Sequence, residues 1–87
     1  MDLNEIRSEI DKIDDELVRL FCQRMHVAAQ VADYKKANNL PIFQPARERA
    51  KLQDVAEKAG PEMANYTRVV YSMLFELSRS YQSKRNG

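Results

Sequence analysis

The chain has 87 residues, enough for one small domain whose core stays limited unless a partner adds to it. Hydrophobic residues make up 44% and charged residues 31%, while two glycines and three prolines exclude collagen-like, linker-rich and turn-dense all-β designs. Lys and Arg number 14 against 13 Asp and Glu, and this formal charge of +1 argues against a nucleic-acid binder.

The remaining composition indicates a reducing compartment and no membrane span. Cys22 is the only cysteine, which excludes an internal disulfide and a multi-cysteine metal site. No run of 18 apolar residues occurs, and the acidic, amphipathic N-terminal segment is unlike a signal peptide. His26 has no second His or Cys beside it, so no metal site is expected. We therefore expect a cytoplasmic, all-helical single domain over residues 1–87.

The first predicted helix runs from about residue 3 to about residue 38. Asp2 or Asn4 can cap its start, and the segment Asn38-Asn39-Leu40-Pro41 ends it, because asparagine tolerates the left-handed cap and proline cannot continue the turn. Its apolar residues recur at alternating spacings of three and four and, after one interruption, resume in phase, which indicates a heptad seam of Leu3, Ile6, Ile10, Ile13, Leu17, Leu20, Val27, Val31 and Tyr34.

The length of this helix predicts an assembly of two chains. At 1.5 Å per residue the helix is roughly 54 Å long, whereas a compact chain of this size has a radius of gyration of about 12 Å. The outer half of the helix therefore overshoots its own domain and needs another chain to pack against. We predict an intertwined homodimer.

Two shorter helices follow. The second begins with Pro45 at its first position and ends at Gly60, with Leu52 and Val55 on its buried stripe. The third covers about residues 62–83, and the polar tail after it is expected to fray. Its apolar residues recur at helical spacing: Met63, Tyr66, Val70, Met73, Leu74, Leu77 and Tyr81. The predicted fold class is all-α, with long, short and medium helices in a helical-bundle homodimer.

Two cations on the first helix lack local partners. Arg24 occupies a seam position, and neither Arg24 nor Lys35 has an acidic residue three or four positions away. A guanidinium in a bundle seam without a carboxylate is costly, so Arg24 either sets the register, extends to the surface, or binds an anionic ligand. The two cations are eleven residues apart, about 16 Å along nearly one helix face. This arrangement suggests a dianionic small molecule.

Other polar residues carry weaker signals. Arg47 and Glu48 open the second helix, where Glu48 also favours the positive end of the helix dipole. Ser78 and Gln82 stand four residues apart beside the apolar stripe of the third helix. The chain shows no Ser-His-Asp arrangement and no Gly-rich phosphate loop.

Together these residues resemble the all-helical chorismate mutase family, which occurs free-standing and as a domain of bifunctional aromatic-biosynthesis enzymes. The resemblance covers nearly the whole chain and is carried by the segments IRSEIDKIDDELVRLFCQRM, VADYK and PARERA. Aligning FELSRSYQ places Ser78 and Gln82 in the site, whereas a one-residue slip would place Leu77 and Tyr81 there. The helical spacing favours the first alignment.

The resemblance implies conversion of chorismate to prephenate and a role for each matched residue. Arg7 and Arg24 would bind the two substrate carboxylates, with Ser78 assisting near one of them. Lys35 and Gln82 would donate hydrogen bonds to the ether oxygen of the breaking bond. This unimolecular pericyclic rearrangement needs no nucleophile, metal or cofactor, but benefits from a held conformation and from positive charge near the ether oxygen.

The resemblance also implies a polar wall from the second helix. Glu48 would accept a hydrogen bond from the ring hydroxyl of the substrate, and Arg47 would support the wall. Gln44 stands where the family commonly has an acidic residue near the same hydroxyl. Its carbonyl oxygen can still accept a hydrogen bond, so the departure weakens one contact.

Helix geometry assigns Arg7 to the partner chain. Arg7 precedes Arg24 by 17 residues and Lys35 by 28, which correspond to about 25 and 42 Å along one helix. A substrate under about 10 Å across, well within ordinary pocket dimensions, cannot contact all three from one chain. Arg7 of the second chain must therefore complete each site.

Two other functions remain open on the sequence. One is an isochorismate-pyruvate lyase of the same fold, which would use a very similar set of cations. The other is a non-catalytic helical dimerisation or regulatory module, which would not need the unpaired Arg24 and Lys35. Activity on chorismate and on isochorismate separates these alternatives.

Overall fold

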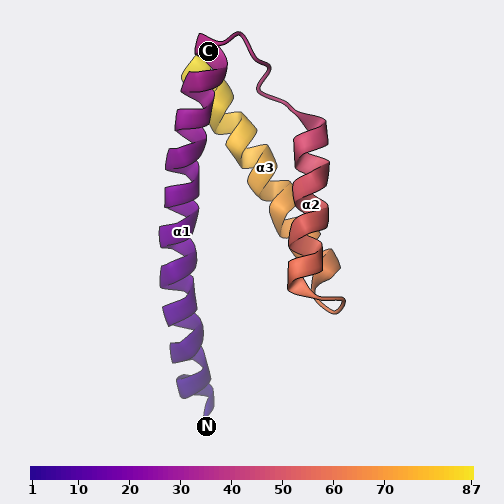
Figure 1. Ribbon diagram of the computed structural model, residues 1–87. Helices are drawn as coiled ribbons and strands as arrows, with labels where there is room; N and C mark the ends of the chain where they lie inside the picture. The colour runs from indigo at the N-terminus through magenta and orange to yellow at the C-terminus, as the bar shows by residue number, and fades with distance from the viewer.

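The computed structural model describes all residues, 1–87, and consists of three α-helices without strands (Figure 1): α1 (Leu3–Ala37), α2 (Pro45–Ala59) and α3 (Ala64–Asn86). The predicted all-α class and the long, short, medium order are confirmed. α3 packs against both α1 and α2, whereas α1 and α2 do not pack against each other. α3 is therefore the element that positions the other two. No helix combines the length and apolar character needed to cross a bilayer.

Local signals explain where α1 begins and ends. The side chain of Asp2 accepts a hydrogen bond from the backbone N–H of Glu5 at 2.8 Å, and thus caps the first turn. At the other end, Asn39 adopts a left-handed conformation with φ of 55°, which asparagine tolerates better than most residues. The backbone N–H of Leu40 donates to the carbonyl of Lys35 at 2.9 Å. The chain then turns toward α2.

Proline and glycine bound α2. Pro45 occupies the first helical position, where its fixed φ suits the helix and its missing N–H is not needed. Gly60 follows the helix with φ of 85°, a conformation that other residues rarely adopt. Both bounds agree with the sequence prediction.

The end of α3 differs from the prediction. The helix begins at Ala64 and continues to Asn86, so the expectation of a frayed tail after residue 83 was wrong. Arg85 forms an ion pair with Asp33 at 3.0 Å, and the side-chain amide of Asn86 donates to the carbonyl of Ala32 at 3.1 Å. These contacts attach the last turn of α3 to α1.

The core of the single chain is small and rich in alanine. The buried apolar residues are Ala28, Ala29, Ala32, Val55, Ala56 and Phe75. Alanines on α1 let α3 approach closely. The larger apolar residues along the N-terminal half of α1 remain exposed: Leu3, Ile6, Ile10, Ile13, Leu17 and Leu20. The heptad seam thus has no packing partner within the chain.

The elongated shape of the chain follows from its small core and its long, largely exposed first helix. Its principal extents are 54 × 26 × 14 Å, and its radius of gyration is 16.0 Å, well above the value of about 12 Å for a compact chain of this length. Figure 1 shows the N-terminal end of α1 extending past the ends of α2 and α3.

α3 carries two distinct faces. Phe75, Ser78 and Gln82 are buried against the rest of the chain. Most of the predicted apolar stripe lies on another face and stays exposed, namely Tyr66, Val70, Met73 and Leu77. A stripe on α3 and a seam on α1 are therefore both available for a second chain.

Ala32 provides a test of the contact between α1 and α3. The residue is 0% exposed, so Ala32→Leu should overpack this contact and lower the free energy of unfolding by about 1–3 kcal/mol. Urea denaturation followed by circular dichroism measures the change. The exposed Ala46→Leu in α2 is the matched control and should change stability by less than about 0.5 kcal/mol. Equal midpoints for the two variants would contradict the packing described here.

Candidate functional site

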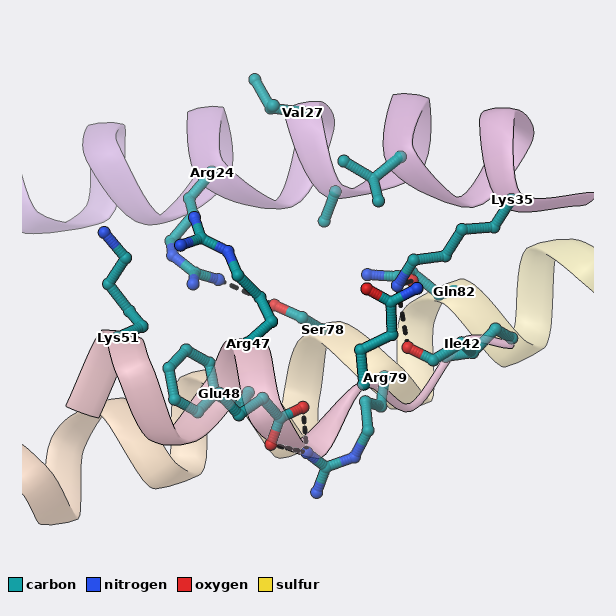
Figure 2. Close-up of a pocket in the computed structure, with 14 residues that line it drawn as sticks. Arg24, Val27, Lys35, Ile42, Arg47, Glu48, Lys51, Ser78, Arg79 and Gln82 are labelled. Atoms are coloured by element: carbon teal, nitrogen blue, oxygen red, sulfur yellow. Dashed lines mark hydrogen bonds and ion pairs between the residues drawn. The ribbon is translucent and has the colours of Figure 1, made fainter. Parts of the chain in front are cut away.

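A groove of about 410 Å³ lies between the C-terminal half of α1 and the N-terminal half of α2, over α3 (Figure 2). It contains every predicted site residue except Arg7, which lies on the exposed N-terminal half of α1. Leu77 and Tyr81, the residues of the slipped alignment, are not part of its lining. The lining residues are Arg24, Val27, Ala28, Val31, Lys35, Ile42, Gln44, Arg47, Glu48, Lys51, Phe75, Ser78, Arg79 and Gln82.

Arg24 defines one end of the groove. Its Nη1 donates a hydrogen bond to Oγ of Ser78 at 2.8 Å. The centre of its guanidinium lies 6.0 Å from the ring centroid of Tyr71 and 5.7 Å from that of Phe75, within the range of a cation–π contact. Ser78 itself is only 7% exposed. Arg24 therefore turns toward α3 and is partly buried there, instead of extending into solvent.

Lys35 defines the other end. Its Nζ donates to the backbone carbonyl of Ile42 at 2.8 Å and to Oε1 of Gln82 at 3.5 Å. Burial lowers the pKa of Lys35 below its ordinary value, and the negative charge of nearby Glu48 offsets part of this shift. Neither Lys35 nor Arg24 forms an ion pair with a carboxylate. Both ammonium and guanidinium therefore remain available to an anionic ligand.

Gln82 and Gln44 supply amide groups to the same region. Gln82 is 7% exposed, and its oxygen faces the Lys35 ammonium, so its Nε2 is the end left to donate toward the groove. Gln44 is the residue before α2, and its side chain makes no capping bond to that helix. Its amide is thus also free to bind a ligand hydroxyl.

Glu48 lies in the first turn of α2, where it is held by a residue that the sequence did not reveal. Nη1 of Arg79 donates to both carboxylate oxygens of Glu48, at 2.5 and 2.6 Å. In the sequence Arg79 follows Glu76 at i, i+3, the spacing of an ordinary pair on a solvated helix face. Only the packing of α3 against α2 brings it to Glu48. Lys51 was missed for a similar reason, since it pairs with Asp54 three residues later.

The groove carries a strong excess of positive charge. Its lining contains a single carboxylate, Glu48, against five cationic side chains: Arg24, Lys35, Arg47, Lys51 and Arg79. Such a surface favours a ligand with two negative charges. Nowhere in the chain do three or more His, Cys, Asp or Glu side chains gather as metal ligands. The arrangement can hold a dianion by both ends and place N–H donors beside its centre.

Known proteins resemble the chain over this region. Residues 6–83 match the family described as chorismate mutase type II. A T-protein of Haemophilus influenzae is 48% identical over 61 residues, covering 67% of this chain and 16% of that protein. A bifunctional chorismate mutase/prephenate dehydratase of Aquifex aeolicus is 46% identical over 54 residues, covering 62% of this chain and 15% of that protein.

A shorter relative matches as well. A chorismate mutase of Methanocaldococcus jannaschii is 40% identical over 47 residues, covering 54% of this chain and 48% of that protein. The chain thus spans about a sixth of the length of the two longer relatives and about half of this one.

Proposed function

The chain belongs to the chorismate mutase type II family, and from this membership we propose that it converts chorismate to prephenate. The observation that carries the proposal is the pair of unpaired cations at opposite ends of one groove, Arg24 and Lys35 (Figure 2). Chorismate carries two carboxylates and an ether oxygen that gains negative charge as its bond breaks. The groove offers positive charge for the carboxylates and N–H donors for the ether oxygen.

Each carboxylate is assigned an arginine. Arg24 binds one of them, because a guanidinium offers a fork of N–H donors and only Nη1 is engaged, by Ser78. Ser78 fixes the orientation of this guanidinium and lies beside the bound carboxylate. The second carboxylate is bound by Arg7 of a second copy of the chain.

The ether oxygen is assigned to Lys35 and Gln82. The two side chains are in contact, and both reach the groove from different helices. Positive charge and an amide N–H aimed at an atom that becomes negative stabilise the transition state more than the ground state. Glu48 and the Gln44 carbonyl accept from the ring hydroxyl, while Arg47 completes the polar wall. The reaction then needs no proton transfer by the protein.

We propose an intertwined homodimer that supplies Arg7 across the interface. Support comes from the exposed seam of α1 and from the length of this helix, which separates Arg7 from the groove of its own chain. Arg7 stands about 25 Å along α1 from Arg24. The single free cysteine agrees with a reducing, cytoplasmic compartment.

Concentration dependence tests the dimer. Dimers alone should be stably folded, so the midpoint of thermal unfolding should rise with protein concentration, and sedimentation should find dimers at micromolar concentration. Ile10→Lys should lower the midpoint, because Ile10 is on the seam. It is 50% exposed in the single chain, so a monomer would tolerate this change as well as the matched control Ser8→Lys. A stably folded monomer, or equal midpoints for the two variants, would refute the dimer.

An assay separates the proposed reaction from its alternatives. The purified protein should consume chorismate and form prephenate, with little turnover of isochorismate. Preference for isochorismate with release of pyruvate would identify a lyase of the same fold. Failure to consume either compound would favour the non-catalytic dimerisation module.

A further inference from the structure

Two charged side chains of the groove, Lys51 and Arg79, have no role in the proposed reaction. Lys51 pairs with Asp54 on its own helix, whereas Arg79 pairs with a residue of another helix. Arg79 follows Ser78 directly and precedes Gln82 by three residues in α3. Successive residues of an α-helix are rotated by about 100°, so Arg79 projects away from the α1 side on which Ser78 and Gln82 meet Arg24 and Lys35. Its guanidinium instead reaches α2 and holds both oxygens of Glu48 (Figure 2).

The position of Arg79 is fixed on a second side. The centre of its guanidinium lies 4.8 Å from the ring centroid of Phe43, in the segment that connects α1 to α2. The side chains of Arg79 and Glu48 are only 32% and 22% exposed. Reduced contact with water strengthens such a pair relative to a surface pair. Arg79 therefore holds Glu48 in one defined orientation.

Glu48 would behave differently without this partner. It is the only carboxylate of the lining, and Lys35 already senses its charge. A carboxylate released from Arg79 would be free to turn toward Lys35, which has no carboxylate partner and on which the charge of Glu48 already acts. The other charged groups that line the groove with Lys35 are Arg24 on its own helix and, on the other two helices, Arg47, Glu48, Lys51 and Arg79. An ion pair between Glu48 and Lys35 would engage the ammonium that the proposed reaction needs.

We propose that Arg79 is a positioning residue: it aims Glu48 at the ring hydroxyl of the substrate and keeps this carboxylate from pairing with Lys35. The inference rests on the proposed function and extends it to a residue that contacts no substrate itself. Arg79 acts only through Glu48.

The first test is Arg79→Ala. We expect kcat to fall about tenfold, because Lys35 becomes engaged by Glu48, and we expect a smaller change in KM. The alkaline limb of the pH–rate profile should move to higher pH, since a closer carboxylate raises the pKa of Lys35. Arg79→Lys retains the positive charge and should recover part of both effects. Arg85→Ala removes another α3 arginine, one that pairs with Asp33 outside the groove, and should leave kcat unchanged.

The second test separates positioning from a general effect of charge or folding. Removing Arg79 also removes a cation near Lys35, and this direct effect persists in any background. Glu48→Gln removes the carboxylate that Arg79 holds, so adding Arg79→Ala to it should lower kcat far less than the same change does in wild type. An equal loss of kcat in both backgrounds would overturn the proposal, as would an unchanged kcat in the single variant. Far-ultraviolet circular dichroism and melting of each protein exclude unfolding as the cause.

A third measurement does not depend on activity. Titration of the Lys35 side chain by NMR, with ¹³C-labelled lysine, should show a higher pKa in Arg79→Ala than in wild type. The same comparison between Arg79→Ala/Glu48→Gln and Glu48→Gln should show a smaller difference in the pKa of Lys35. Equal margins would overturn the role of Arg79. If wild type fails to turn over chorismate while the larger margin is observed, the proposed reaction fails and the positioning of Glu48 stands.

Discussion

Arg7→Ala and Lys35→Ala proteins will each lose chorismate turnover by at least about a hundredfold, since each lacks a cation that the proposed function places directly on the substrate. An equal mixture of the two, after subunit exchange, will recover about a quarter of the wild-type activity. Half of the mixed dimers are heterodimers, and one of the two sites in each heterodimer has both cations. This recovery is expected because, in the proposed homodimer, Arg7 and Lys35 of one chain serve different sites.

Matched variants make this experiment decisive. Lys36→Ala removes the neighbouring exposed lysine of α1 and should leave turnover close to wild type. Mixing Lys35→Ala with Gln82→Ala should restore nothing, because both changes damage the site of their own chain. Native mass spectrometry establishes that exchange has occurred. Heterodimers without recovered activity would refute a site shared between chains.

Gln82→Glu will convert a nearly pH-independent enzyme into one that works only in acid. An ionised carboxylate repels the charge developing on the ether oxygen and donates no hydrogen bond, so turnover near neutral pH should fall by about a hundredfold or more. The protonated form can donate in place of the amide, and activity should therefore rise as pH falls through the pKa of the new carboxyl. Burial raises this pKa and the Lys35 ammonium, which contacts position 82, lowers it.

The wild-type profile provides the reference. The kcat/KM of wild type should be nearly flat around neutral pH, because the Gln82 amide does not titrate and the proposed reaction transfers no proton to or from the protein. Because burial lowers the pKa of Lys35, activity should decline on the alkaline side at a lower pH than an ordinary lysine would give. Gln30→Glu makes the same chemical change at an exposed position of α1 and should follow wild type. A Gln82→Glu profile parallel to wild type would mean that residue 82 does not contact the ether oxygen.

The helices were predictable because their limits depend on local chemistry. Asp2 and Pro45 set the start of a helix and Gly60 sets the end of one, each within one turn of its own position. The heptad spacing of apolar residues indicates the extent of α1 directly. The end of α3 was not predictable in this way. Arg85 and Asn86 extend the helix through partners on α1 about fifty residues earlier, and a polar tail shows no sign of such partners in the sequence.

The candidate site shows the same division. Arg24 and Lys35 stood out because the sequence offers them no acidic neighbour, and the structure leaves both without one. Arg79 escaped notice because Glu76 offered it a neighbour on its own helix, whereas its partner Glu48 lies 31 residues away. A sequence thus reveals a cation that has no acidic residue at helical spacing. It does not reveal a cation that has such a neighbour but pairs with a distant carboxylate in the folded chain.

The hydrogen bonds of Lys35 limit what that side chain can do. An ammonium has three N–H bonds arranged as a tripod. Ile42 and Gln82 take two of them, and so a single N–H remains, with its direction set by the other two. Lys35 therefore presents one aimed donor instead of a diffuse charge. Arginine at this position would keep the positive charge but replace the ammonium by a planar guanidinium. The guanidinium could not donate to the Ile42 carbonyl and still point a second N–H in the direction of the free N–H of Lys35.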